Sequence, residues 1–123
     1  MIQGVGVDLL SIERMAGRAA QERFMARVFS GREREELARC GNKAETLAGR
    51  FCAKEAVSKA LGIALAMHDL PCIIIDGMQG QPQVVLTGHV KEQFDRAGGG
   101  RIHVSITHER GRAAAFAVWE TED

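Results

Sequence analysis

The apolar positions of the chain predict its clearest helix near the middle of the sequence. Between residues 46 and 61, small and apolar side chains recur at the spacing of one helix face, in a segment of good helix formers. Gly62 follows where a helix commonly ends in a left-handed residue, so we expect the helix to end at Leu61. The apolar face consists of Ala53, Ala56, Val57, Ala60 and Leu61.

Two further helical stretches are expected before this helix. From residue 12 to 29, apolar residues recur at roughly helical intervals among arginines, with Gly17 as a weak point, which predicts one helix or two short ones. Ser30 and Glu33 stand at the spacing with which a hydroxyl and a carboxylate cap a helix start reciprocally. A helix is therefore expected from there to about Cys40.

The remaining segments favour β-strands. Residues 2–7 alternate apolar residues with glycine, which predicts a short strand that another element approaches closely, with Asp8 at its end. Residues 72–75 and 82–86 are β-favouring runs joined by a turn-rich connection, which predicts a hairpin. A short helix containing Val90 and Phe94 is expected next, before three glycines.

The last part of the chain has the pattern of a second hairpin. Residues 101–107 alternate cleanly between apolar and polar side chains, residues 108–111 turn the chain, and residues 113–119 return as a strand of small residues. Helices concentrated in the first half and antiparallel strands in the second predict an α+β fold. We expect the first strand to join one sheet with both hairpins, within a single domain over residues 1–123.

Composition narrows the class of protein. A chain of 123 residues with 46% hydrophobic and 26% charged residues has the balance of a globular protein, and its 16 basic residues equal its 16 acidic residues, which disfavours a globally basic nucleic-acid binder. No apolar run approaches the roughly 20 residues of a membrane span, and the charged first 20 residues do not resemble a secretory signal. We expect a cytoplasmic protein with reduced cysteines.

Charged side chains at two places in the sequence are candidates for chemistry. Glu55, Ser58 and Lys59 lie with Phe51 on the side of the central helix away from its apolar face. The alternative is an ordinary helix pair of Glu55 with Lys59, worth roughly 0.2–0.5 kcal/mol. Asp8 could hold a hard cation together with a second carboxylate, or could simply form a turn or cap.

Basic and hydroxyl side chains form two further candidate sites. Four arginines, at positions 14, 18, 23 and 27, are either a solvated helix face or a docking surface for an acidic partner. The run Ser105, Thr107 and His108 at a strand end could present hydroxyls, an imidazole and backbone N–H groups to a phosphate. His103 and His108 fall on opposite faces of a regular strand, so a metal site built on both is not expected.

Three stretches, in this order, resemble one known family. They are Gly4 to Leu9, GRFCAKEAVSKALG at 49–62, and HVSITHERGRAAAFAV at 103–118. A Gly-x-Pro at 80–82 agrees with them. The set resembles holo-acyl-carrier-protein synthase, the small bacterial type of 4′-phosphopantetheinyl transferase. The family usually has Gly-Thr-Gly after the central helix, where this chain has Gly62-Ile63-Ala64.

The resemblance implies a Mg²⁺-dependent transfer of phosphopantetheine from coenzyme A to a serine of apo acyl carrier protein, with release of adenosine 3′,5′-bisphosphate. It implies that Asp8 and Glu55 ligate the metal and that Lys59 contacts phosphate. The serine proton could pass to Glu55 directly, to Glu55 through water, or to bulk base. The expected coenzyme A contacts are Arg50, Phe51, Ser58, Lys59, Gly80, Pro82, Thr107 and His108.

The resemblance also implies the assembly and the protein partner. Family members form trimers with their sites at subunit interfaces, and the first helical stretch docks the acidic carrier protein, here through Arg14, Arg18 and Phe24. The competing hypothesis is a non-catalytic module of the same fold that binds coenzyme A or the carrier protein.

Overall fold

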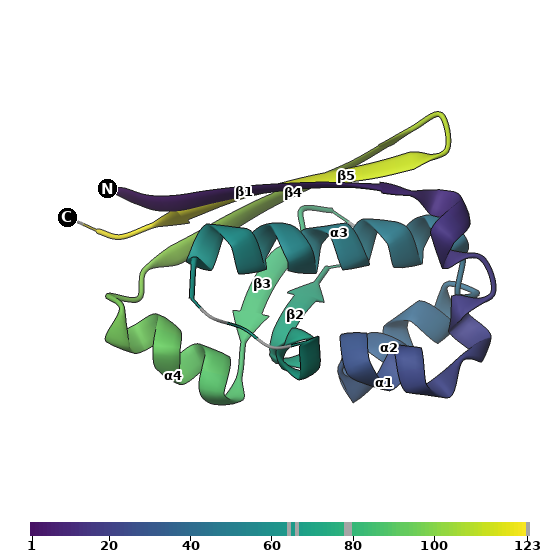
Figure 1. Ribbon diagram of the computed structural model, residues 1–123, viewed down its shortest axis with the longest axis horizontal. Coiled ribbons are helices and arrows are strands. Elements are labelled where there is room, and N and C mark those ends of the chain that lie inside the picture. The colour runs from purple at the N-terminus through teal and green to yellow at the C-terminus, as the bar shows by residue number, and fades with distance from the viewer. Residues whose placement is uncertain (64, 66, 78–79, 123) are drawn as a thin grey trace.

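The protein has an α+β fold in which a long helix lies between sheets and shorter helices (Figure 1). The computed structural model describes all residues except 64, 66, 78–79 and 123. The elements are β1 (Ile2–Ser11), the 3₁₀ turns η1 (Ile12–Met15) and η2 (Arg18–Ala20), α1 (Glu22–Val28), α2 (Gly31–Arg39), α3 (Ala44–Leu61), η3 (Met67–Cys72), β2 (Ile73–Asp76), β3 (Gln83–Leu86), α4 (Gly88–Arg96), β4 (Arg101–Glu109) and β5 (Arg112–Glu120).

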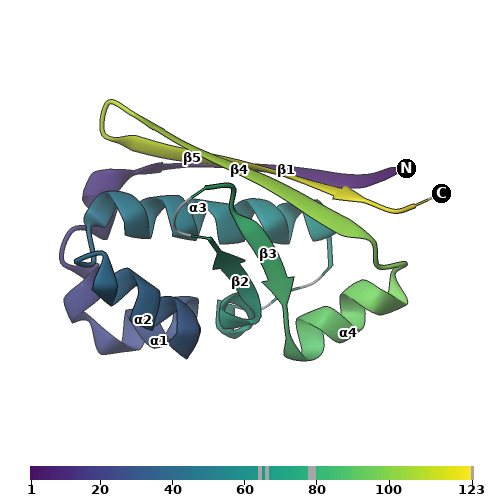
Figure 2. The ribbon, with the colours of Figure 1, turned by 180° about the vertical axis from the view of Figure 1, so that it is seen from behind.

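The strands form two antiparallel sheets on different sides of α3. One sheet has the order β1-β5-β4, and the other is the β2-β3 pair. Both ribbon views place the three-stranded sheet along one side of α3, with α1, α2, α4, β2 and β3 toward its other side (Figures 1 and 2). The helix is thus covered from both sides, and 11 of its 18 residues are buried.

The helix and hairpin predictions for the middle of the chain are confirmed. The Ser30 hydroxyl accepts a hydrogen bond from the backbone N–H of Glu33, whose carboxylate accepts one from the N–H of Ser30, so α2 begins with the predicted capping box. Gly62 ends α3 in a left-handed conformation with φ of 60°. The predicted helix near Val90 is α4.

Three predictions about segment boundaries are wrong. The first strand continues past residue 7 to Ser11, because its ladder with β5 runs on to the pair of Ser11 with Arg112, so Asp8 lies within the strand. Residues 12–29 form neither one helix nor two short α-helices: Gly17 takes a left-handed φ of 78° between two 3₁₀ turns, and only α1 follows them as an α-helix. His108 belongs to β4, because the turn is confined to residues 110–111.

The two hairpins do not share a sheet, although we expected them to. β2 pairs with β3, and side chains instead of a strand occupy its other edge: Glu33 accepts the N–H of Ile75, and Arg50 donates to the carbonyl of Ile75. These buried contacts satisfy the backbone groups that a further strand would otherwise bind.

In the described part of the chain, no helix has the length and apolar character to cross a membrane.

Two glycines allow β1 to lie directly against α3, as the sequence predicted for this strand. A Cβ atom on Gly4 would stand 1.9 Å from the carbonyl oxygen of Ala60, and one on Gly6 would stand 1.9 Å from that of Ala56. Neither glycine has a positive φ, so the requirement is for space and not for backbone freedom. The close approach brings the next inward-facing residue, Asp8, to the helix surface.

Gly6→Ala is therefore expected to lower the free energy of unfolding by about 3 kcal/mol or more, because the added methyl group must push strand and helix apart. Gly31→Ala is the matched control: apart from its chain neighbours and its own helix backbone, no atom lies within 4 Å of its added Cβ, and its effect should stay within about 1 kcal/mol. Urea unfolding of both variants measures the difference. Equal changes would show that the packing of β1 on α3 does not depend on a missing side chain.

Candidate active site

A carboxylate from β1 and one from α3 lie on the same side of the helix. Asp8 follows Gly6 on the inward face of β1, and Glu55 lies on the part of α3 that this strand crosses. The Nζ atom of Lys59 donates to the carbonyl of Val7 at 2.9 Å and to Oδ1 of Asp8 at 3.3 Å. Lys59 thus pairs with Asp8, so its role goes beyond the ordinary helix pair with Glu55 that spacing alone suggests.

Two carboxylates, Asp8 and Glu55, and a single ammonium group, Lys59, determine the electrostatics of this site. Burial raises the pKa of Glu55, and the negative charge of Asp8 raises it further, while Lys59 acts in the opposite direction. Burial, followed by the charge and hydrogen bond of Asp8, raises the pKa of the nearby Cys52 thiol to about 12. The thiol is therefore protonated at neutral pH and adds no further negative charge.

The donor set fits a hard divalent cation. Both acids offer carboxylate oxygens, the ligands that Mg²⁺ prefers, and the mutual repulsion between them is what a bound cation would relieve. Among the described residues, no group of three or more His, Cys, Asp or Glu side chains could hold a metal ion. Asp8 and Glu55 would supply two ligands, and Mg²⁺ commonly completes its shell with water and phosphate oxygens.

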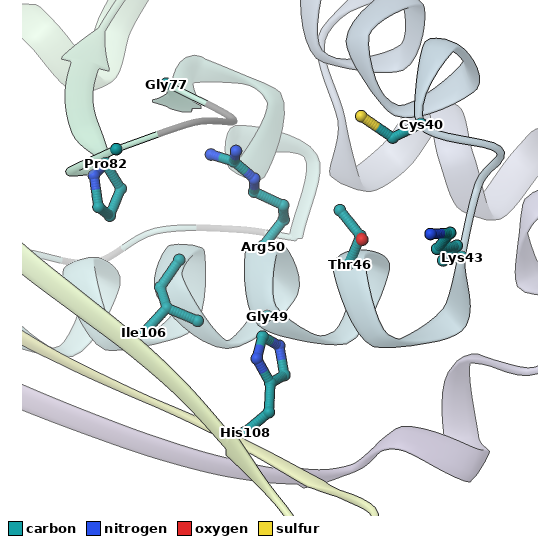
Figure 3. A pocket seen from close by; sticks show the side chains of 10 residues that line it. Cys40, Lys43, Thr46, Gly49, Arg50, Gly77, Pro82, Ile106 and His108 are labelled. Carbon is teal, nitrogen blue, oxygen red and sulfur yellow. The ribbon is translucent and has the colours of Figure 1, made fainter.

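A pocket of about 450 Å³ lies on another side of α3 (Figure 3). It is bounded by the first turns of α3, the end of α2, the segment between β2 and β3, and the end of β4. Four of the predicted coenzyme A residues, Arg50, Gly80, Pro82 and His108, line it. The other lining residues are Cys40, Lys43, Thr46, Gly49, Gly77 and Ile106.

Two cationic side chains, Arg50 and Lys43, give this pocket a positive charge. Arg50 is 7% exposed, and its Nη1 atom donates to the carbonyl of Ile75 at 3.0 Å. Burial lowers the pKa of Arg50, and nearby acids, Glu36 first among them, raise it; a guanidinium stays charged in either case. Lys43 precedes the first turn of α3. The pocket therefore suits an anionic ligand.

His108 reaches the helix because Gly49 leaves room for its ring. A Cβ atom on Gly49 would stand 2.9 Å from Nε2 of His108. This Nε2 atom lies 3.1 Å from the carbonyl oxygen of Glu45, a group that can only accept, so Nε2 carries a proton in this contact. Figure 3 shows the imidazole beside Gly49 at the edge of the pocket, below Thr46 and Arg50.

The structure places the other predicted coenzyme A residues away from this pocket. Phe51 packs against Phe24, with 6.2 Å between the ring centroids. Thr107 is exposed and pairs with Ala114 on the outer face of the sheet, because Ile106 and not Thr107 faces inward. Ser58 and Lys59 lie in the same half of α3 as Glu55, and neither lines the pocket.

Sequence reasoning missed four side chains of the pocket, Cys40, Lys43, Thr46 and Ile106, besides Gly49 and Gly77. A signal for two of them exists, because residues 43, 46 and 50 recur at the spacing of one helix face. Cys40 carries no such signal. It reaches the pocket only because the chain turns at residues 41–42 between α2 and α3, with a left-handed conformation at both.

The arginines of the first helical stretch surround a second pocket, of about 350 Å³. It brings together the predicted partner residues Arg14, Arg18 and Phe24, and the guanidinium carbon of Arg18 lies 5.1 Å from the centroid of the Phe24 ring. Phe51 contributes to its wall. Cationic groups around an aromatic floor suit an acidic protein surface with an apolar anchor.

The carboxylate site and the larger pocket lie on different sides of α3. At 100° per residue, Glu55 points about 140° away from Arg50 around the helix. Asp8 belongs to β1 and His108 to β4, the two edge strands, with β5 between them. One copy of the chain therefore presents the two halves of the predicted site in different directions.

Comparisons with known proteins agree with the resemblance. The family model of the 4′-phosphopantetheinyl transferase superfamily matches residues 4–117. The chain is 40% identical over 124 residues to holo-acyl-carrier-protein synthase of Clostridium kluyveri, covering 99% of this chain and 92% of the relative. This chain belongs to that transferase family. The predictions of the family, of a transferase and of the α+β fold class are thereby confirmed.

Solved structures of holo-acyl-carrier-protein synthases share the fold. The synthase of Neisseria meningitidis superposes with a TM-score of 0.85 at 28% identity, covering 98% of this chain and 100% of the other. The Helicobacter pylori synthase, solved in complex with coenzyme A, superposes with a TM-score of 0.76 at 29% identity, covering 94% of this chain and 99% of the other. The departure from the family pattern at residues 62–64 includes Ala64, which lies outside the described residues.

Proposed function

We propose that this chain transfers the 4′-phosphopantetheine group of coenzyme A to a serine hydroxyl of apo acyl carrier protein, in the presence of Mg²⁺. The observation that carries the proposal is the joining of Asp8, Glu55 and Lys59 where β1 crosses α3. The family membership and the coenzyme A complex of the Helicobacter pylori relative support it.

The proposed reaction exchanges the phosphoanhydride bond of coenzyme A for a phosphodiester bond to serine. The serine oxygen forms a bond to the phosphorus that carries pantetheine, the bond from that phosphorus to the bridging oxygen breaks, and adenosine 3′,5′-bisphosphate leaves while the serine loses its proton. Asp8 and Glu55 would hold Mg²⁺, which when bound neutralises charge on the pyrophosphate oxygens. The Lys59 ammonium, 56% exposed beside Asp8, can contact the same phosphates electrostatically.

The larger pocket is the proposed place for the nucleotide end of coenzyme A. Lys43 and Arg50 supply positive charge toward its phosphates, and His108 presents a ring edge at the border. Because this pocket and the Asp8–Glu55 pair lie on different sides of α3, we propose that one active site takes its pocket from one copy and its carboxylates from the next.

An exposed apolar face supports the assembly that such sharing requires. On the side of the sheet away from α3, Val5 is 55% exposed, Val7 60%, Leu9 60% and Phe116 47%. Val7 and Phe116 are direct cross-strand neighbours, so these side chains form one continuous surface on β1 and β5. Contiguous apolar surface of this kind marks an interface. We propose that further copies of the chain cover it in a trimer.

The arginine pocket is the proposed docking site for the acidic carrier protein. Arg14→Glu combined with Arg18→Glu is expected to raise KM for carrier protein at least about tenfold, more at low salt, because repulsion replaces attraction on a solvent-screened surface. KM for coenzyme A should change little. Steady-state kinetics at two salt concentrations measure both constants, and an unchanged KM for carrier protein would place the docking surface elsewhere.

Incubation of the protein with apo acyl carrier protein, coenzyme A and Mg²⁺ tests the proposed function. Mass spectrometry should detect a phosphopantetheine adduct on the carrier, and omission of Mg²⁺ should prevent its formation. Binding of both partners without an adduct would favour the non-catalytic module.

A further inference from the structure

Buried side chains complete the outer edge of β2. Its carbonyl at Ile73 accepts a hydrogen bond from Nζ of Lys54 at 2.6 Å, and its N–H at Ile75 donates to Oε2 of Glu33 at 3.0 Å. Arg50 donates to the carbonyl of Ile75 at 3.0 Å. Residues 73 and 75 have the same orientation in the strand, so these bonds form one row along the edge that β3 leaves open.

Glu33 and Lys54 form an ion pair at the centre of this row. Nζ of Lys54 lies 2.6 Å from Oε1 of Glu33 and also donates to the carbonyl of Leu70 at 2.9 Å. The side chains of Lys54 and Glu33 are 0% and 4% exposed. Oε1 of Glu33 additionally accepts the N–H of Ser30 at the start of α2. Two residues thus fasten α2, α3, η3 and β2 to one another.

The end of β2 that these bonds hold leads directly into a wall of the larger pocket. Asp76 follows Ile75 and forms an ion pair with Arg32 of α2, and its Oδ1 accepts the N–H of Gly77 at 3.0 Å. Gly77, Gly80 and Pro82 line the pocket together with Arg50, and Figure 3 shows the Arg50 side chain pointing toward the side on which Gly77 and Pro82 lie. The position of this wall relative to α3 is therefore set by the contacts of the β2 edge.

We propose that Glu33 and Lys54 are positioning residues for coenzyme A, through the wall of the pocket that follows β2. The inference rests on the proposed function, since it assigns coenzyme A to this pocket. A buried ion pair is a poor means of adding stability, because desolvation offsets its attraction, and apolar residues of similar size often serve as well. Hydrogen bonds are directional, and apolar contacts are not. The pair therefore fixes which backbone atoms of β2 face α3, whereas apolar packing would leave that orientation open.

The test compares three variants with a control. Lys54→Met keeps the aliphatic stem and removes the three hydrogen bonds; Glu33→Gln weakens the pair; the double variant removes both charges, and so can fold even where one unpaired buried charge prevents folding. Val90→Ala, at a fully buried position of α4 that does not line the pocket, controls for lost stability. Calorimetry gives Kd for coenzyme A, and kinetics give KM for each substrate.

The variants that fold, the double variant included, should show Kd and KM for coenzyme A raised about 10- to 100-fold, with KM for carrier protein changed less than about twofold. Val90→Ala should leave all three constants near their wild-type values at a similar loss of thermal stability. Coenzyme A constants that match the control in the double variant would overturn the inference and leave the proposed function intact. Wild-type protein that takes up no coenzyme A would overturn the proposed function, and the inference with it.

Discussion

Asp8→Asn and Glu55→Gln should each reduce phosphopantetheine transfer about 1,000-fold or more while leaving the fold intact. Each substitution removes one of the two carboxylates that would hold Mg²⁺, and the charge stabilisation by a bound cation is worth several kcal/mol, with a factor of ten in rate for each 1.4 kcal/mol. Adduct formation followed by mass spectrometry over a range of Mg²⁺ concentrations measures the loss. Glu92→Gln, on the exposed face of α4, is the matched control and should keep wild-type activity.

The stability of the Glu55→Gln variant should separate this loss from unfolding. Burial and Asp8 raise the pKa of Glu55, so the ionised group reduces the free energy of unfolding at every pH above that raised pKa. Glutamine lacks this penalty. Without Mg²⁺, the melting temperature of the variant at pH 8 should therefore be no lower than that of wild type. Any difference in its favour should vanish as pH falls below the ordinary glutamate pKa. Full activity, or a large drop in melting temperature, would show that the assigned role of Glu55 is wrong.

Two inactive variants should restore activity to each other when they are mixed. Glu55→Gln damages the carboxylate half of the proposed site, and Lys43→Glu with His108→Ala damages the pocket half. If each site takes one half from each of two neighbouring copies, random assembly of an equal mixture leaves about a quarter of the sites with both halves intact. Activity should thus rise from near zero to about a quarter of the wild-type value.

Co-expression or refolding together, followed by the adduct assay, provides the measurement. A single chain that carries all three substitutions is the control, since it contains no intact half and should stay inactive when it is mixed with either variant. A mixture no more active than the sum of its components would mean that each copy holds a whole site.

Local pattern predicted most of the elements because local physics decides them. The Ser30 and Glu33 cap, the left-handed Gly62 and the apolar alternation in β4 depend on neighbours in the sequence, and the structure has each of them. The merging of both hairpins into one sheet failed for a non-local reason. Nothing near residues 73–75 indicates that Glu33, some 40 residues earlier, will bind that edge.

The candidate site divides in the same way. The motif around Glu55 and Lys59 indicated the chemistry, and Gly6 before Asp8 indicated the close approach that brings the acids together. The separation of Phe51 from Arg50 was not foreseen, although the two are neighbours in the sequence. Adjacent residues on a helix point about 100° apart, so one faces the larger pocket while the other joins the arginine pocket.

The completed edge of β2 also bears on self-association. Ile73, Ile74 and Ile75 are three consecutive buried isoleucines, a sequence of the sort that nucleates fibrils when its backbone is open to other chains. Lys54, Glu33 and Arg50 already bond three backbone groups of that edge, so a foreign strand would have to displace them. Buried charged side chains thereby oppose the addition of another strand at this edge, whereas in other proteins exposed charges more often do so.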